Sequence, residues 1–314
     1  MNKVSADAAR TSEFARLAIE GLTTSPKRAE AKFFYDEKGS QLFDRICELE
    51  EYYPTRTETA ILRDRAPELA EWVPEGAALV ELGSGSSIKT GLLLDALPGL
   101  GAYVPLDIST EHLHASAAAL AARHPGLEVH PVAGDFTRDI ALPADLAETP
   151  KLLFFPGSTI GNFTPDEAGK LLRRMRNVEG VAGFVVGVDL RKDADRLVRA
   201  YDDAKGVTAA FNKNLLHRMN SELGADFDPE AFAHEARWND AQSRIEMHLV
   251  SLRDQTARIG GHAIDFAAGE TIHTESSHKY STEAFRDLAQ AAGWTSRDVW
   301  IDADSLFSVH VLTP

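Results

Sequence analysis

A glycine-rich turn carries the most informative chemistry in this sequence. Residues 79–82 form an apolar strand pattern, residues 83–85 read Gly-Ser-Gly, and residues 88–97 have the apolar spacing of a helix. A buried strand, a tight turn and a helix N-terminus together make the corner of a doubly wound sheet that faces phosphate or nucleoside groups. Glycine permits the sharp turn and lets a ligand lie against the backbone. We therefore predict a nucleoside-cofactor site with contacts from Glu81, Gly83, Ser84 and Gly85.

The residues around this turn narrow the choice of cofactor. A dinucleotide fingerprint has a third glycine three residues on, where this chain has Ile88, so a nicotinamide reductase is the weaker alternative. The acid just before the turn favours S-adenosylmethionine. Asp107 ends the next predicted strand, where a carboxylate can accept hydrogen bonds from both ribose hydroxyls. Asp135 and Phe136 end the strand after that, and they offer a polar contact and an apolar edge for adenine.

Composition limits the class of protein. The chain has 314 residues, a net charge of −15 and a single cysteine, Cys47. A strongly acidic chain without a basic cluster is a poor partner for nucleic acid or an anionic membrane surface. One cysteine excludes an internal disulfide, and neither a signal peptide nor a membrane-spanning stretch is visible. We expect a soluble, cytoplasmic protein that is a monomer, although nothing in the sequence itself determines the oligomeric state.

The elements that must position these residues alternate from residue 79 onward. Strand patterns at residues 79–82, 103–107, 127–132, 152–155 and 183–189 are separated by helical patterns. This alternation predicts an α/β fold with a parallel sheet covered on both faces. Ligands of such sheets bind outside the carboxyl ends of the strands. The loops after residues 82, 106, 133 and 155 should therefore converge.

The rest of the chain follows a different pattern. Residues 7 to about 73 read as helices, with Ser40 as an expected N-cap, and residues 233–250 read as a hairpin that turns at Asn239-Asp240. A final helix and strand pair, residues 282–311, should return to the sheet. We predict a cofactor-binding domain of residues 58–195 and 281–314. A substrate-binding domain would comprise residues 1–57 and 196–280.

Several further motifs carry a family resemblance. They read Phe34-Tyr35-Asp36, Leu42-Phe43-Asp44, Glu51-Tyr52-Tyr53-Pro54-Thr55-Arg56, Gly157-Ser158-Thr159-Ile160-Gly161-Asn162 and Thr274-Glu275-Ser276-Ser277. With the glycine turn, they resemble the class I S-adenosylmethionine-dependent methyltransferases and, among these, the histidine Nα-methyltransferases of ergothioneine biosynthesis, which trimethylate L-histidine to hercynine. The resemblance implies a Rossmann-like sheet with a second, α+β substrate-binding domain formed by the N-terminus and an insertion.

The resemblance also implies roles for individual residues. Gly83 and Lys89 would lie along the methionine end of the cofactor, Asp107 on the ribose, and Asp135 and Phe136 on the adenine. Residues 157–161 would form the floor of the substrate site. Asn162 and Tyr35 would be the catalytic residues, with Asn162 holding the amino-acid head group and Tyr35 lining the amine. The further substrate contacts would come from Tyr52, Phe43, Tyr201, Met247, Glu275 and Ser277.

The types of these residues suit the implied substrate. Glu275 and Ser277 are two apart, so on a strand both side chains face the same way. A carboxylate accepts one imidazole N–H, and a hydroxyl serves the second nitrogen in either role. Met247 alternates with Ile245 and Leu249, a pattern that by itself predicts a core position, and only the resemblance moves Met247 to the pocket.

The reaction would need little acid–base machinery. The sulfonium is already a strong methyl donor, so we expect catalysis by proximity and in-line orientation, without a dedicated base. Two alternatives stay open: Nα-methylation of another amino acid, such as tryptophan or a thiolated histidine, and a cofactor-binding sensor without turnover. The isolated histidines show no metal-ligand spacing, and we expect His112 and His114 on the surface.

Overall fold

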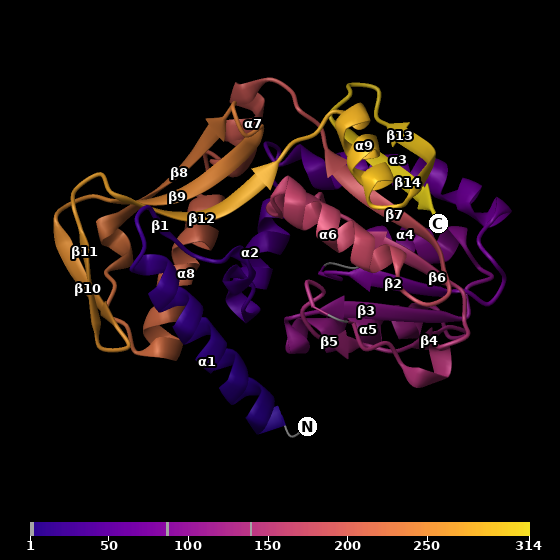
Figure 1. Cartoon of the computed structure of the whole chain (residues 1–314), viewed down its shortest axis with the longest axis horizontal. Coiled ribbons are helices and arrows are strands. Elements are labelled where there is room, and N and C mark those ends of the chain that lie inside the picture. The colour runs from indigo at the N-terminus through magenta and orange to yellow at the C-terminus, as the bar shows by residue number, and fades with distance from the viewer. Residues whose placement is uncertain (1–2, 86–87, 139) are drawn as a thin grey trace. The chain divides into compact units, whose positions relative to one another are not determined.

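The chain folds as two compact units. The computed structural model describes residues 3–85, 88–138 and 140–314, with side chains from residue 12 onward; Ser86 and Ser87, which follow the glycine turn, lie outside this part. Unit 1 comprises residues 1–52 and 193–276, and unit 2 comprises residues 53–192 and 277–314 (Figure 1). The borders lie a few residues before those predicted from sequence. The roles assigned to the two domains stay predictions.

Unit 2 is built on a mixed sheet whose strands are mostly parallel. Its strand order is β13-β14-β7-β6-β2-β3-β4, and β5 also pairs with β3. Among the strands of this sheet that the structure describes, only β14 runs antiparallel to its neighbours, β13 and β7. The predicted α/β fold is confirmed. The strands, in chain order, are β2 (Ala78–Leu82), β3 (Ala102–Asp107), β4 (Glu128–Val129), β5 (Val132–Ala133), β6 (Lys151–Phe155), β7 (Val181–Asp189), β13 (Thr295–Ile301) and β14 (Phe307–Thr313).

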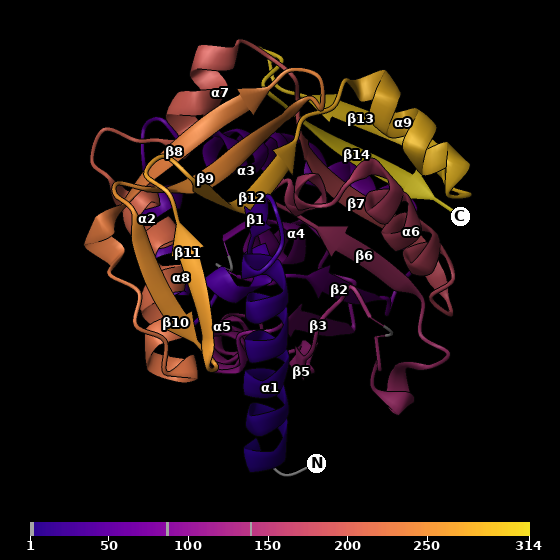
Figure 2. The ribbon, with the colours of Figure 1, turned by 60° about the vertical axis from the view of Figure 1, so that its left-hand side comes forward.

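Helices cover both faces of this sheet, which explains its continuous apolar strands. One face packs against α3 (Tyr53–Arg65), α4 (Ile88–Ala96) and α5 (Thr110–Arg123) through a buried cluster that includes Leu62, Leu93 and Leu120. The other face packs against α6 (Pro165–Arg176) and α9 (Thr282–Ala291) through Leu172 and Phe285 (Figure 2). Short 3₁₀ turns complete the unit: η2 (Ala66–Glu71), η3 (Ala144–Leu146) and η4 (Thr159–Asn162).

Unit 1 combines a second sheet with helices. Its four-stranded sheet has the order β1-β12-β9-β8, and a separate pair is formed by β10 and β11. The predicted hairpin is confirmed as the antiparallel pair β8 and β9. The elements are α1 (Lys3–Leu22), β1 (Lys27–Arg28), η1 (Ala31–Phe34), α2 (Glu37–Cys47), α7 (Ala194–Tyr201), α8 (Val207–Leu223), η5 (Pro229–Ala231), β8 (Phe232–Asn239), β9 (Arg244–Ser251), β10 (Gln255–Ile259), β11 (His262–Phe266) and β12 (Thr271–His278).

Some local predictions are corrected by the structure. Ser40 is not an N-cap but a buried residue inside α2, whose cap is Asp36 with its carboxylate 2.7 Å from the Gly39 amide. The strand predicted at 127–132 is two short strands, β4 and β5, and the strand β10 was not predicted. No described helix has both the length and the apolar composition needed to cross a membrane.

A buried charge cluster lies at the carboxyl end of β7 in unit 2. Asp189 is fully buried, and its two oxygens lie 2.6 Å from Lys192 Nζ and 2.7 Å from Lys279 Nζ. The Tyr53 hydroxyl donates to the same carboxylate at 2.8 Å. Burial alone would raise the pKa of Asp189, but the two ammonium groups lower it below its usual value. The carboxylate therefore stays ionised and ties the start of α3 to β7.

We expect Asp189→Asn to lower the free energy of unfolding by about 3–5 kcal/mol near pH 7, because two buried ammonium groups lose their counter-charge. Urea denaturation measures this change. Asp298→Asn is the matched control, since this half-exposed aspartate lies 3.7 Å from Arg297 and its loss should cost less than about 1 kcal/mol. Equal stability losses in the two variants would contradict the role given to Asp189.

Candidate functional site

The glycine turn of unit 2 follows β2 and lies against the end of β3. Gly83 has a φ of +70°, a conformation that favours glycine, and its amide donates to the Leu106 carbonyl at 2.8 Å. The Asp107 carboxylate accepts from the Ser109 amide at 2.8 Å and, more weakly, from the Gly85 amide at 3.4 Å. Burial raises the pKa of Asp107, and these amides offset part of the rise. Asp107, the residue predicted to bind the ribose, therefore lies beside the glycine turn.

The loop after β5 brings an aromatic ring to the same place. A Cβ atom added at Gly83 would lie 3.6 Å from the Phe136 ring. The Phe136 ring in turn packs edge-on against Phe155, at a centroid distance of 5.2 Å. The neighbouring Asp135 carboxylate accepts from the Thr137 amide at 2.9 Å. The ends of three strands thus meet, as the parallel sheet requires, and Phe136 forms an apolar wall beside the turn.

Lys89, at the start of α4, is held by a residue that the sequence did not indicate. Its Nζ lies 2.6 Å from Glu58 Oε2, and the same oxygen accepts the Gly157 amide at 2.8 Å. Glu58 is fully buried on α3. A side chain at Gly157, whose φ is +77°, would lie 3.4 Å from Lys89 Nζ. Glu58 therefore positions Lys89 against the 157–161 loop, although nothing in its local sequence distinguishes it from other helical acids.

Glu81 anchors the turn from within the protein. Its Oε2 accepts hydrogen bonds from Thr90 Oγ1 at 2.7 Å and from the Tyr103 hydroxyl at 2.5 Å. Burial raises the pKa of Glu81 to about 7, despite these two donors. The carboxyl group thus links β2 to α4 and β3, and its contact with a cofactor stays a prediction.

One histidine belongs to this region, contrary to the sequence-based prediction. His112 is half-buried, and its Nε2 lies 3.1 Å from the Gly85 carbonyl, so the predicted surface position is wrong for it. His114 is exposed, as predicted. The i, i+2 spacing indicated correctly that the two rings face different ways, but not that α5 turns His112 toward the glycine turn.

The 157–162 loop and the end of β12 form a second group within unit 2. His278 Nδ1 lies 3.0 Å from the Gly161 carbonyl, next to Asn162 at the end of η4. Lys279 Nζ donates to Ser277 Oγ at 2.9 Å while it pairs with Asp189. An ammonium group can only donate, so Ser277 is the acceptor in this bond and directs its own hydrogen elsewhere.

Four of the aromatic residues assigned to the substrate form a chain of ring contacts in unit 1. Tyr35 and Phe43 have a centroid distance of 5.7 Å, Phe43 and Tyr52 of 6.2 Å, and Tyr52 and Tyr201 of 6.1 Å. Phe211 on α8, which the sequence did not single out, contacts Tyr35 and Phe43 at 5.7 and 6.1 Å. The cluster offers several ring faces together with phenol hydroxyls.

Electrostatics connect this cluster to β12. Burial raises the pKa of Tyr52 well above its usual value, and Tyr201, Cys47, Tyr35 and the Glu275 carboxylate raise it further. Tyr52 therefore stays protonated at neutral pH and cannot act as a base.

Met247 lies on β9 beside β12. The Thr274 hydroxyl donates to the Met247 carbonyl at 3.0 Å, and the Met247 side chain is buried. The burial agrees with the core position that its alternation predicts. Its role in a pocket wall stays a prediction.

The raised pKa of Glu81 predicts a pH-dependent stability. A carboxyl group whose folded pKa is raised contributes stability below its unfolded pKa, and this contribution is lost as pH rises through the folded value, here about 7. Measured by thermal unfolding, the free energy of unfolding of the native chain should therefore fall between about pH 5 and about pH 7. We expect a decrease of up to about 1.4 kcal/mol per pH unit relative to Glu81→Gln. Glu71→Gln, at an exposed carboxylate of the same unit, is the control. Parallel pH profiles for native chain and Glu81→Gln would contradict the prediction.

Comparison with known proteins agrees with this geometry. Residues 14–314 match the family model described as histidine-specific methyltransferase, SAM-dependent. The histidine N-alpha-methyltransferase of Mycolicibacterium smegmatis is 44% identical over 93% of this chain and 92% of its own, and that of Mycobacterium tuberculosis is 44% identical over 94% and 93%. Ergothioneine biosynthesis protein 1 of Neurospora crassa is 31% identical over 91% of this chain and 33% of its own length.

Proposed function

The chain belongs to the histidine-specific, SAM-dependent methyltransferase family, and from this membership we propose that it converts L-histidine to hercynine by three Nα-methylations, the first step of ergothioneine biosynthesis. The observation that carries the proposal is the chain of ring contacts between Tyr35, Phe43, Tyr52 and Tyr201, and Glu275 on β12 also raises the pKa of Tyr52. A cationic trimethylammonium product and an imidazole ring both suit such surroundings.

Unit 2 would hold the cofactor. The bound S-adenosylmethionine supplies an electrophilic methyl group on a sulfonium. Asp107 would accept hydrogen bonds from the ribose, and Phe136 would cover the adenine beside Gly83, whose conformation lets a ligand approach the backbone. Lys89, held by Glu58, would lie along the methionine end. This arrangement fits the cofactor because every one of these groups lies at the carboxyl edge of the sheet.

β12 would recognise the imidazole through two different polar groups. Glu275 would accept the N–H of the ring. Ser277 accepts a hydrogen bond from Lys279, and its hydroxyl would donate to the unprotonated ring nitrogen of the substrate. This pair would favour the neutral imidazole, which has one donor and one acceptor. Substrates without this pattern would leave buried polar groups unpaired.

The protein would contribute position more than proton transfer. Tyr52 is protonated, and Asn162 carries no charge, so both would orient the amino acid without removing its proton. The amine proton would leave to water before each attack on the methyl group. Tyr35 and Phe43, whose rings meet edge-on, would stabilise the growing ammonium charge by cation–π attraction. We further propose a cytoplasmic location, on the grounds of the single cysteine, and we propose that the protein is a monomer.

Cofactor binding tests the role of Asp107. We expect Asp107→Ala to weaken binding of S-adenosylmethionine about 10- to 100-fold, because hydrogen bonds from two ribose hydroxyls to a charged group are lost. Isothermal titration calorimetry with S-adenosylhomocysteine gives the same comparison without turnover. Asp95→Ala, at a half-exposed position of α4, should bind like the native chain. Unchanged affinity in Asp107→Ala would remove this residue from the site.

Product mass tests the substrate. With L-histidine and the cofactor, mass spectrometry should show the addition of three methyl groups, and Glu275→Ala should lower kcat/KM for histidine about 100-fold or more because one ring nitrogen loses its partner. Glu230→Ala is the control, since its side chain on the same unit is exposed.

Other results of this assay would contradict parts of the proposal. Methylation of tryptophan or a thiolated histidine, without histidine turnover, would overturn the assignment of the substrate. Tight cofactor binding without any product would indicate a sensor. Full activity in Asn162→Ala would overturn the orienting role of that residue.

A further inference from the structure

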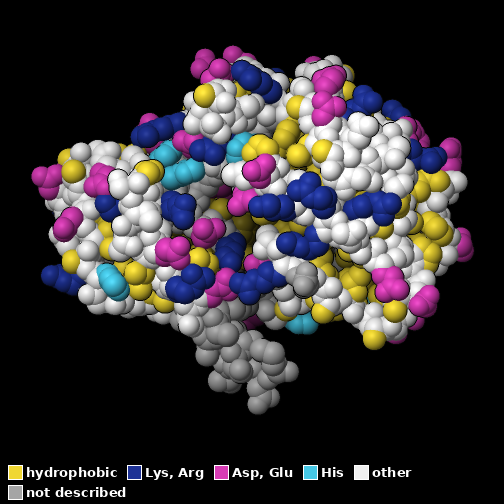
Figure 3. Space-filling view, viewed as in Figure 1, with side chains coloured by type: hydrophobic (Ala, Val, Ile, Leu, Met, Phe, Trp, Pro, Cys, Tyr) yellow, Lys and Arg dark blue, Asp and Glu magenta, His cyan; other side chains and the backbone are white. Residues whose placement is uncertain are grey.

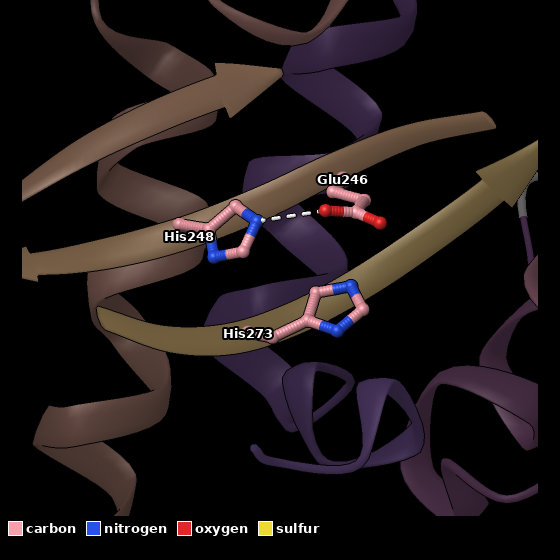
Figure 4. Close-up of side chains that lie close together, drawn as sticks. All are labelled: Glu246, His248 and His273. Carbon is pink, nitrogen blue, oxygen red and sulfur yellow. Dashed lines mark hydrogen bonds and ion pairs between the residues drawn. The ribbon is translucent and has the colours of Figure 1, made fainter. Parts of the chain in front are cut away.

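Three side chains of types that ligate metals meet on the sheet of unit 1, on the strands that also carry Met247 and Glu275. Glu246 and His248 stand on the same side of β9, and His273 stands on the neighbouring strand β12 (Figure 4). One ligating atom of each lies within 4.8 Å of the other two. We propose that Glu246, His248 and His273 bind a divalent transition-metal ion that clamps β9 to β12.

The carboxylate is already oriented as a metal ligand requires. Glu246 Oε1 accepts hydrogen bonds from Asn239 Nδ2 at 2.9 Å and from Arg244, whose guanidinium lies 2.6 Å away. The other oxygen, Oε2, lies 3.2 Å from His248 Nε2. Outer hydrogen bonds of this kind hold ligating carboxylates in place.

The two imidazole rings lie close together on neighbouring strands. They stack with a centroid distance of 5.0 Å and an interplanar angle of 21°. His273 Nε2 lies 2.9 Å from the Glu275 carbonyl and 3.1 Å from Ser276 Oγ, contacts that orient the ring.

The spacing suits a small ion with four ligands. In tetrahedral zinc sites with bonds of about 2.0–2.1 Å, neighbouring ligand atoms lie about 3.3 Å apart. The 3.2 Å between Glu246 Oε2 and His248 Nε2 already has this length. The widest separation, at most 4.8 Å, needs a closure of about 1.5 Å, which side-chain rotation provides. Water would complete the coordination.

The ligand types select the class of metal. Two imidazole nitrogens and one carboxylate oxygen favour zinc, cobalt, nickel or copper over magnesium and calcium, which prefer oxygen ligands alone. On the face shown in Figure 3, histidine side chains, in cyan, gather over the sheet that contains β8 and β9.

Cobalt titration of the untagged chain tests the site. We expect one Co²⁺ per chain, with the intense visible absorption of a tetrahedral site, and its displacement by Zn²⁺. His273→Gln and Glu246→Gln should weaken Co²⁺ binding by at least about tenfold. His248→Gln should weaken binding in the same way. Because His248 is buried, this variant can fail to fold, and in that case the variant of the half-buried His273 decides the test.

Two controls separate this site from other histidines. His262→Gln, at an exposed position on β11, and His130→Gln should bind Co²⁺ like the native chain. His130 belongs to a second group, with Glu128 and Asp145, whose ligating atoms also lie within 4.8 Å of one another. Loss of binding in His130→Gln, unchanged binding in His273→Gln and Glu246→Gln, or no Co²⁺ uptake by the native chain would each overturn the proposal.

Discussion

The structure of unit 2 depends on charged side chains that are buried at the carboxyl edge of its sheet and must therefore be paired. An unpaired buried charge is far more costly than an unpaired exposed one, so each of these groups constrains its neighbours. Asp189 holds Lys192, Lys279 and Tyr53, while Glu58 holds Lys89 and the Gly157 amide. These contacts connect α3, α4, β7 and the residues after β12. These buried contacts therefore hold the loops that would bind the cofactor in place, even without a bound ligand.

This arrangement suits a reaction in which the cofactor itself is the reactive group. A sulfonium needs no activation, so the remaining tasks are alignment, recognition and accommodation of a product cation. Fully paired carboxylates such as Asp189 are unsuited to proton abstraction, and the phenol of Tyr52 is held in its protonated form. The ionisable groups of the protein thus act mainly as supports, and the aromatic rings of unit 1 offer the surroundings that a quaternary ammonium prefers.

β12 links several of the features described above. It carries His273, which lies close to Glu246 and His248 on β9, Glu275, which raises the pKa of Tyr52, and Ser277, which accepts a hydrogen bond from Lys279. These three residues are spaced two apart along one strand. A metal clamp at His273 would stabilise the strand that also carries the proposed imidazole ligands.

The sequence by itself determined the features that depend on local spacing. The glycine turn, the acids at the strand ends and the alternation of elements predicted the α/β fold and the convergence of Gly83, Asp107 and Phe136, because the carboxyl ends of parallel strands share one edge. Family motifs selected Tyr35, Phe43, Tyr52 and Tyr201, which the structure places in mutual contact. Only the tertiary structure decided which distant groups are paired. Glu58 and Lys89 are 31 residues apart, Glu58 and Gly157 are 99 apart, and His248 and His273 meet only because β9 lies beside β12. No local pattern records such pairings, since they arise from the packing of elements and the requirement that buried charges find partners.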